Sequence, residues 1–205
     1  MNDIYIVTHS PLISGAALES LFRFYSSLVQ ADNQISTHVV PNLVISADKA
    51  PKAESNPSNV AKCIAQVVRS QHDVAAGTIA EYVKYLKPTS KAKPSLVILS
   101  LLIIGELGRF MFVLFVTEMF LISQNFLSDM SPQNGVFQLV INHFSADQED
   151  IRAAAAFSAG NIAVGNLHQF LPAIVKMVET DQKKRLLALH AAKEVGCFYP
   201  VLPMG

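Results

Sequence analysis

The stretch at residues 147–166, DQEDIRAAAAFSAGNIAVGN, constrains the fold more than any other part of the sequence. Charged residues open it, four alanines and Phe157 follow, and only Ser158 and Asn161 are polar in its middle. A helix with this pattern is apolar around most of its circumference, so it must be buried on several sides. The sequence therefore predicts a central helix that ends at Gly165 and that other helices surround.

Apolar residues also recur at helical spacing along the rest of the chain, and no stretch after residue 10 alternates like a strand. The expected helices lie at about residues 10–30, 34–46, 58–69, 74–86, 95–110, 132–144, 147–166, 171–180 and 181–196. Two polar, proline-containing stretches, residues 47–58 and 87–94, are expected to be loops. The chain is predicted to be all-helical.

Several expected helix ends depend on single residues. Ser10-Pro11 and Ser131-Pro132 are typical helix starts, and Ser58 is an expected N-cap. Pro41 is expected to interrupt its helix, and Pro172 to delay the next start until near Leu171. Thr180 or Asp181 is expected to cap the last helix and Gly196 to end it, which leaves residues 197–205 as an irregular tail.

Five of the expected helices share one frame, in which a charge or proline is followed by small and apolar residues and then a turn. Aligning residues 94–110 with residues 150–166 places Gly105 on Gly160 and Glu106 on Asn161. The frame position, defined by these two glycines, falls at Phe24, Ala65, Gly105, Gly160 and Lys193. Three of the four intervals are near the length of roughly 40 residues that is typical of two-helix repeats.

The exception is the interval from Gly105 to Gly160, which is the longest of the four. It contains an apolar segment that has no place in the frame, residues 112–128 (FVLFVTEMFLISQNFLS). Removing this segment would bring the interval close to the length of the other repeats. We hypothesise that the segment derives from a retained intron or from wrongly assigned exon boundaries of the gene.

The repeated pattern resembles HEAT repeats, because Asp150-Ile151-Arg152 and the alanines after it match the second helix of that repeat. A single helical hairpin cannot bury both of its apolar faces, whereas stacked hairpins can. We therefore expect an α-solenoid of about four to five HEAT-type, armadillo-like hairpins, forming a single segment over residues 1–205. The alternative is a closed helical bundle, in which the regular spacing of the frame would be a coincidence.

A more specific resemblance covers about residues 10–110 and 129–195. The segments GAALESLFRFYSSLV, SNVAKCIAQVVR, LLIIGELGR, RAAAAFSAGNIAVGNLHQFLP and KKRLLALHAAKEV are similar to successive repeats of the cullin-associated, neddylation-dissociated family. The resemblance implies an internal part of a much longer solenoid. It also implies a non-enzymatic scaffold that binds cullin–RING ubiquitin ligases lacking the ubiquitin-like modifier and regulates their assembly with substrate receptors, as in SCF complexes.

The chain departs from this family in its short length, in residues 112–128 and in its tail. A HEAT scaffold of another class, a nuclear transport receptor or a phosphatase scaffold, is the alternative interpretation. A small helical enzyme is a third, but it needs a convergent polar site that the sequence does not show. HEAT recognition uses surface positions without a motif, so the partner-binding residues are left unknown.

The composition of the chain bears on which classes of partner and which cell compartment are expected. Lys plus Arg equals Asp plus Glu, 16 residues each, which gives no basis for electrostatic capture of nucleic acid. Charged residues make up 16% of the chain, where about 25% is typical. Two distant cysteines, the absence of an acceptor sequon for N-glycosylation and an N-terminus unlike a signal peptide favour the cytoplasm and nucleus.

Two apolar runs, residues 96–104 and 112–122, resemble membrane spans at first sight. Glu106 and Arg109 separate them, Glu118 lies inside the second, and neither reaches the roughly 18 uncharged residues that a span requires. Burial in the solenoid is expected for the first run. For the second, membrane association is the minor alternative.

No cofactor, metal or small-molecule site is expected. The six histidines, His9, His38, His72, His143, His168 and His190, show no ligand spacing, and Cys63 is expected to be a small core residue. The glycines around Glu106 and Asn161 fit neither a dinucleotide nor a phosphate loop, so close helix packing explains them. Glu149-Asp150 is expected to begin a helix, where the helix dipole favours negative charge.

The basic residues of the chain are expected to have structural roles. Arg152 is expected to pair with an acidic residue of an adjacent repeat, with contact to a partner as the alternative. The lysines of residues 49–52 and 87–93, and Lys183-Lys184-Arg185, are expected to face water, with binding of an acidic partner as the alternative.

Overall fold

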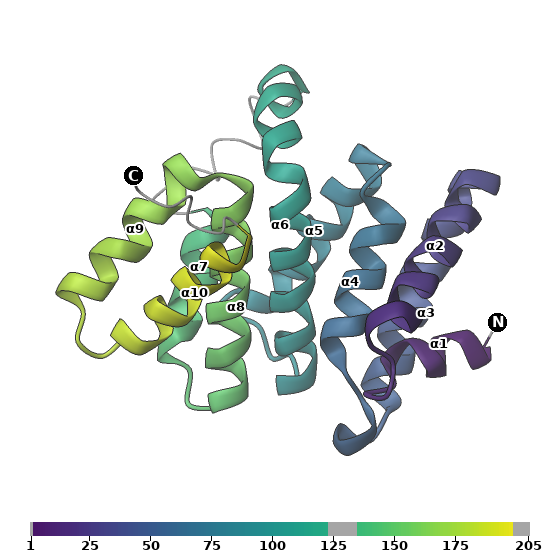
Figure 1. Cartoon of the computed structure of the whole chain (residues 1–205), viewed down its shortest axis with the longest axis horizontal. Helices are drawn as coiled ribbons and strands as arrows, with labels where there is room; N and C mark the ends of the chain where they lie inside the picture. Colours follow the sequence, from purple (N-terminus) through teal and green to yellow (C-terminus); the bar gives the residue numbers. More distant parts are fainter. Residues whose placement is uncertain (1, 123–134, 199–205) are drawn as a thin grey trace. The chain divides into compact units, whose positions relative to one another are not determined.

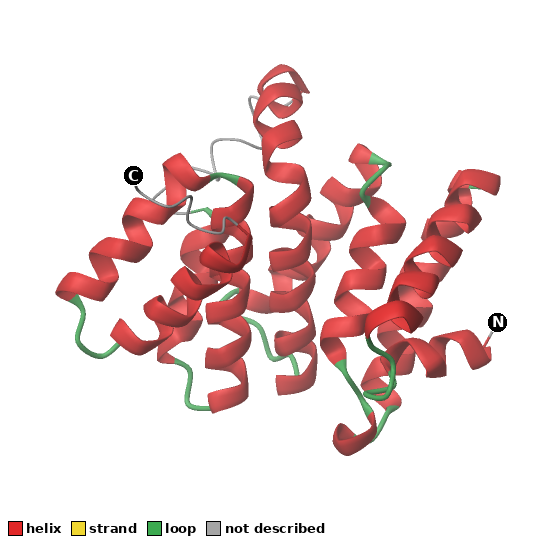
Figure 2. Ribbon diagram, viewed as in Figure 1, coloured by secondary structure: helices red, strands yellow, loops and turns green. Residues whose placement is uncertain are grey.

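The computed structural model describes residues 2–122 and 135–198, and this part of the chain consists of helices and loops without a strand (Figure 2). The all-α fold class with HEAT-type helical hairpins is therefore confirmed. The chain divides into two compact units, residues 1–82 and 83–205. That they form a single solenoid segment over residues 1–205 stays a prediction.

The first unit is built around a short, strongly amphipathic helix, α4. Its elements are α1 (Asn2–His9), α2 (Gly15–Ala31), η1 (Asn33–Ile35), α3 (Ser36–Lys49), η2 (Lys52–Glu54), α4 (Pro57–Val68) and the larger part of α5 (His72–Leu86) (Figure 1). Helix α4 packs against α1, α2 and α3. Most of its side chains are buried, and Gln66 donates a hydrogen bond to Ser26 Oγ of α2.

Two expected helix starts in this unit are wrong. Asn56, not Ser58, caps α4, because its side chain accepts hydrogen bonds from the backbone of Ser58 and Asn59 while Pro57 occupies the first turn. Ser10-Pro11 forms a turn after α1, and α2 begins at Gly15, whose φ of +52° favours glycine. The Asn59 amide holds this turn by donating to the carbonyl oxygens of Ser10 and Ile13.

The alanine-rich helix is the centre of the second unit, as predicted. This unit contains α6 (Pro94–Ile122), α7 (Val136–Asn142), η4 (His143–Ser145), α8 (Glu149–Gly165), α9 (Leu167–Thr180) and α10 (Arg185–Phe198). Helix α8 packs against α6, α7, η4, α9 and α10 (Figure 1). Two carboxylates occupy its first turn, and it ends at Gly165.

Glycines bring α6, α8 and α10 into backbone contact. A Cβ atom on Gly105 of α6 would lie 2.7 Å from Cα of Ser158 in α8, and one on Gly108 would lie 2.7 Å from Cγ1 of Ile162. A Cβ atom on Gly160 of α8 would lie 2.5 Å from the backbone oxygen of Ala191 in α10. At Gly105 and Gly160 an added Cβ would meet backbone atoms, so glycine is required at these two crossings, whereas at Gly108 it would meet the Ile162 side chain.

The two contacts repeat in one register. Gly105 meets Ser158, which lies two residues before the next frame position, and Gly160 meets Ala191, which lies two residues before Lys193. The frame therefore describes a repeated packing relation in this unit. It does not hold for α2, where Phe24 is 41% exposed and the buried row is Leu21, Tyr25 and Val29.

Several expected boundaries in the second unit need correction. Helix α6 does not stop near Phe110, because its backbone stays helical to Ile122. The first part of the 112–128 segment thus continues a helix of this chain. The side chains of 111–122 and all of 123–134, including Ser131-Pro132, lie outside the described residues. The foreign origin of 112–128 stays a hypothesis.

Prolines and glycines interrupt these helices less than expected. Pro41 lies inside α3, and Pro172 lies inside α9, which begins at Leu167 with Asn166 as its N-cap. Both prolines are exposed, so the carbonyl groups that they leave without a backbone donor can bind water. Gly196 does not end α10, which runs to Phe198, and residues 199–205 of the predicted irregular tail lie outside the described residues.

The glycine contacts make a testable prediction. Gly160→Ala should lower the free energy of unfolding by about 1–3 kcal/mol, because the added methyl group forces α8 and α10 apart. Gly77→Ala is the matched control in α5, where an added Cβ meets no atom within 4 Å. It should raise the free energy of unfolding by about 0.5–1 kcal/mol through helix propensity. Urea denaturation measures both, and equal effects of the two substitutions would contradict the contact.

Candidate interaction surface

Buried polar and titratable groups are the candidates for a chemical site in this chain. Within residues 2–122 and 135–198, no three His, Cys, Asp or Glu side chains gather as a metal site would require. Across the same residues, each helix is too short or too polar to traverse a bilayer. The chemistry of the described residues must therefore be considered group by group.

Cys63 and Tyr25 are core residues. Burial raises the pKa of the Cys63 thiol to about 12, so the thiol stays protonated at physiological pH and is a poor nucleophile. Burial also raises the pKa of the Tyr25 hydroxyl, which shares a 2.8 Å hydrogen bond with Thr8. Thr8 in turn donates to the carbonyl oxygen of Ile4. These groups connect α1 to α2.

Among the described residues, Arg152 pairs with no acidic residue of a neighbouring repeat, contrary to expectation. Its guanidinium donates to the backbone oxygens of Ala146 and Asp147, each at 2.8 Å. Both acceptors belong to the loop that enters α8. Arg152 thus orders the start of its own helix, because the guanidinium of a first-turn arginine can reach back across the turn that precedes it.

The core of the second unit contains polar groups on successive helices. The Ser158 hydroxyl lies 2.7 Å from the carbonyl oxygen of Leu101 on α6 and 2.7 Å from that of Ala154 on its own helix, and its one proton is shared between these two acceptors. Glu106 is almost fully buried and lies 3.8 Å from Arg109, whose guanidinium stacks on the Phe110 ring at 4.8 Å. These contacts tie α6 internally and to α8.

Asn161, at the position that aligns with Glu106, differs from its neighbours. It is fully buried, and within the described part of the chain neither amide atom has a hydrogen-bond partner. A buried amide without partners costs stability. Asn59 of α4 is the opposite case, since its buried amide donates two hydrogen bonds.

The lysines of the two expected basic loops, apart from Lys52, whose side chain is not described, are exposed, as expected. At the turn before α10, Lys184 lies 3.8 Å from Asp181, whose carboxylate caps the turn, and Arg185 donates to the carbonyl oxygen of Val178. Lys183 is left facing water. This cluster mainly stabilises the connection between α9 and α10.

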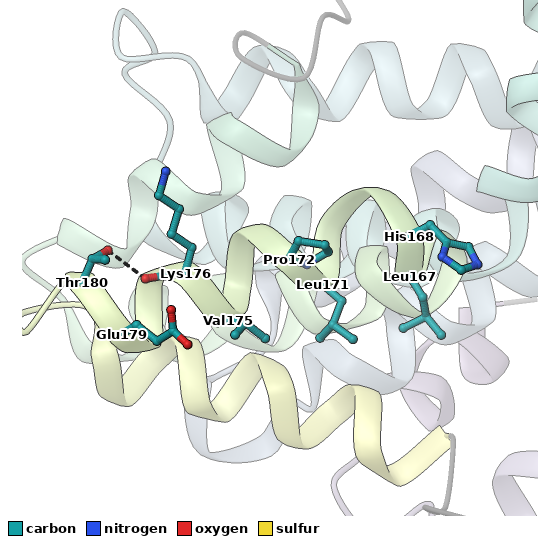
Figure 3. A pocket seen from close by; sticks show the side chains of 8 residues that line it. All are labelled: Leu167, His168, Leu171, Pro172, Val175, Lys176, Glu179 and Thr180. Atoms are coloured by element: carbon teal, nitrogen blue, oxygen red, sulfur yellow. Dashed lines mark hydrogen bonds between the residues drawn. The ribbon is translucent and has the colours of Figure 1, made fainter.

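A shallow hollow is lined by residues of α9 (Figure 3). Its lining residues are Leu167, His168, Leu171, Pro172, Val175, Lys176, Glu179 and Thr180. In Figure 3 the apolar row Leu167, Leu171 and Val175 points toward α10, while the lysine points away. The mixed charges of the lining do not specify one small ligand.

Helix α10 exposes leucines that its apolar pattern places in the core. Leu186 is 64% exposed and Leu189 is 47% exposed, whereas Ala188, Ala191 and Val195 form its buried side. The sequence of α10 has apolar residues on both of its sides. This pattern could have indicated an exposed apolar side, because only one side of the helix faces the core. We call Leu186, Leu189, Lys193 and Gly196 the α10 stripe.

The two buried asparagines make a matched prediction. Asn161→Leu should leave the free energy of unfolding within about 0.5 kcal/mol or raise it, because it removes two unsatisfied polar atoms. Asn59→Leu should lower it by about 1–3 kcal/mol, because the carbonyl groups of Ser10 and Ile13 lose their donor. Thermal and urea unfolding measure the difference. Equal destabilisation by both substitutions would mean that Asn161 has a partner.

Comparison with known proteins identifies the relatives of this chain. No family model matches it. It is 31% identical over 191 residues to cullin-associated NEDD8-dissociated protein 1 of Arabidopsis thaliana, which covers 91% of this chain and 14% of the relative. The protein of that name from Drosophila melanogaster is 29% identical over 224 residues, covering all of this chain and 16% of the relative.

The similarity extends to a second member. Cullin-associated NEDD8-dissociated protein 2 of Mus musculus is 24% identical over 202 residues, which is 95% of this chain and 15% of the relative. The chain thus spans about one seventh of the length of these relatives. Over nearly its whole length, the chain is therefore similar to part of the cullin-associated NEDD8-dissociated proteins.

Proposed function

We propose that this chain is part of a non-enzymatic protein-interaction scaffold that binds cullin–RING ubiquitin ligases. The observation that supports this most is the similarity along nearly the whole chain to relatives that are named for association with cullins. The helical architecture agrees, because stacked hairpins offer a long surface. The same relatives favour this function over that of a transport receptor or phosphatase scaffold.

In this proposal the chain contributes part of an interface spread over many repeats. A specific interface needs about 1,000 Å² or more of buried surface, and shape complementarity rather than one pocket determines it. The regulatory step is exchange of substrate-receptor modules on cullins that lack the ubiquitin-like modifier. Cytoplasm and nucleus are the compartments where such partners would be met.

A chimera tests this function. The matched segment of the Arabidopsis relative is replaced by residues 1–205 of this chain, and pull-down measures binding to an unmodified cullin–RING complex. We expect a dissociation constant within about tenfold of that of the parent. Most contacts with the cullin should lie in repeats outside the exchanged segment, and few residues of any interface contribute strongly to binding. A NEDD8-modified cullin is the control and should bind less.

A second chimera lacks residues 112–128. It should bind at least as tightly as the first, because the contacts of Gly105 and Gly160 do not involve residues 112–128. Circular dichroism verifies that both chimeras fold. A folded second chimera that fails to bind, while the parent binds, would contradict the proposed function.

A further inference from the structure

The hollow on α9 is an apolar surface that the described residues leave open to water. Leu167, Leu171 and Val175 form its apolar row, at spacings of four residues. Val175 is 44% exposed, the two leucines are partly exposed, and the hollow has a volume of about 860 Å³. Contact of apolar side chains with water is unfavourable, so a segment that covers this row would stabilise the hairpin of α9 and α10.

The geometry of this hairpin determines where the chain leaves it. Helices α9 and α10 have 14 residues each, pack against each other and are joined by residues 181–184. Because the two helices are antiparallel, the C-terminal end of α10 lies beside the N-terminal end of α9, which carries Leu167 and His168 (Figure 3). The chain therefore leaves α10, after Phe198, at one end of the hollow.

Residues 199–205, YPVLPMG, follow at this point and lie outside the described residues. They include no charged residue, and their large apolar side chains are Tyr199, Val201, Leu202 and Met204. Pro200 and Pro203 lack a backbone N–H group and restrict the residues before them to extended conformations. The sequence therefore predicts an extended segment similar to a polyproline II helix, which has no internal hydrogen bonds.

The length of this segment matches the length of the hollow. A polyproline II segment rises about 3.1 Å per residue, so seven residues span about 22 Å. An α-helix rises about 1.5 Å per residue, which places Leu167 and Thr180, at the two ends of the hollow, about 20 Å apart. Leu202 comes four residues after Phe198, and Val175 comes eight residues after Leu167. Both steps are about 12 Å, so Leu202 is level with Val175.

We propose that residues 199–205 lie along the hollow and cover the apolar row of α9, with Leu202 against Val175. The segment follows α10 directly, so only a short loop has to close for the contact to form. A segment with two prolines also loses little conformational entropy when it binds. The contact involves no cullin, and it does not depend on the proposed function.

The full chain with Leu202→Trp tests this contact, because the chain contains no other tryptophan. Tryptophan emission moves to shorter wavelength when the indole ring leaves water. We expect emission at shorter wavelength, and weaker quenching by acrylamide, than for a free peptide of residues 199–205 with the same substitution. Emission and quenching equal to those of the peptide would overturn the proposal.

Two further substitutions in this variant locate the contact. Val175→Asp should move the emission toward that of the peptide, because a carboxylate in the hollow opposes burial of the indole ring. Leu189→Asp is the matched control, since Leu189 is 47% exposed at about the same level of α10, and it should leave the emission unchanged. Both positions are exposed, so the fold should persist, which circular dichroism verifies.

The opposite result, sensitivity to Leu189→Asp but not to Val175→Asp, would place the segment on the α10 stripe and overturn the proposal. An emission shift that grows with protein concentration would overturn it as well, because a second copy of the chain would then cover the indole ring.

Discussion

The close approach of α6, α8 and α10 is the constraint on which the second unit depends. At Gly105 and Gly160 the backbones are near enough to exclude any side chain, and at Gly108 an added Cβ would meet the Ile162 side chain. Such contacts gain dispersion energy over many atoms but tolerate no added volume. The alanines of α8 serve the same purpose, because a helix held on several sides needs a small circumference. Polar chemistry is secondary there, and Ser158 and Glu106 are accommodated within the packing.

Much of this arrangement could be predicted from the sequence. Helical periodicity gave the fold class, and the alignment of Gly105 with Gly160 gave the register of two successive contacts. The frame position assigned to α2, Phe24, was wrong, because the alignment there rested on sequence similarity without a close helix crossing. The expectation that Pro41 and Pro172 interrupt their helices was wrong. Both prolines face solvent, where water can bind the carbonyl groups that lose a backbone donor. Capping was misassigned where two candidates, Asn56 and Ser58, lie close together.

The side-chain partners could not be predicted, because they depend on which residues face each other across helices. Arg152, for which an acidic partner was expected, donates hydrogen bonds to backbone carbonyl groups of the loop before its own helix. The exposure of Leu186 and Leu189 was hidden by a second apolar row on the same helix. An array that buries one side of each hairpin leaves the other side exposed and available for contact with a partner. The functional content of this chain is therefore expected at its surfaces, where packing between repeats and recognition of a partner follow the same physical rules.

Native-state hydrogen exchange tests the central claim most directly. If the glycine contacts join the three helices into one stack, the slowest amides of α6, α8 and α10 should share one opening free energy. They should also share one denaturant dependence, because the helices separate only together. Opening of α10 at lower free energy and with a small denaturant dependence, while α6 and α8 stay protected, would contradict the account.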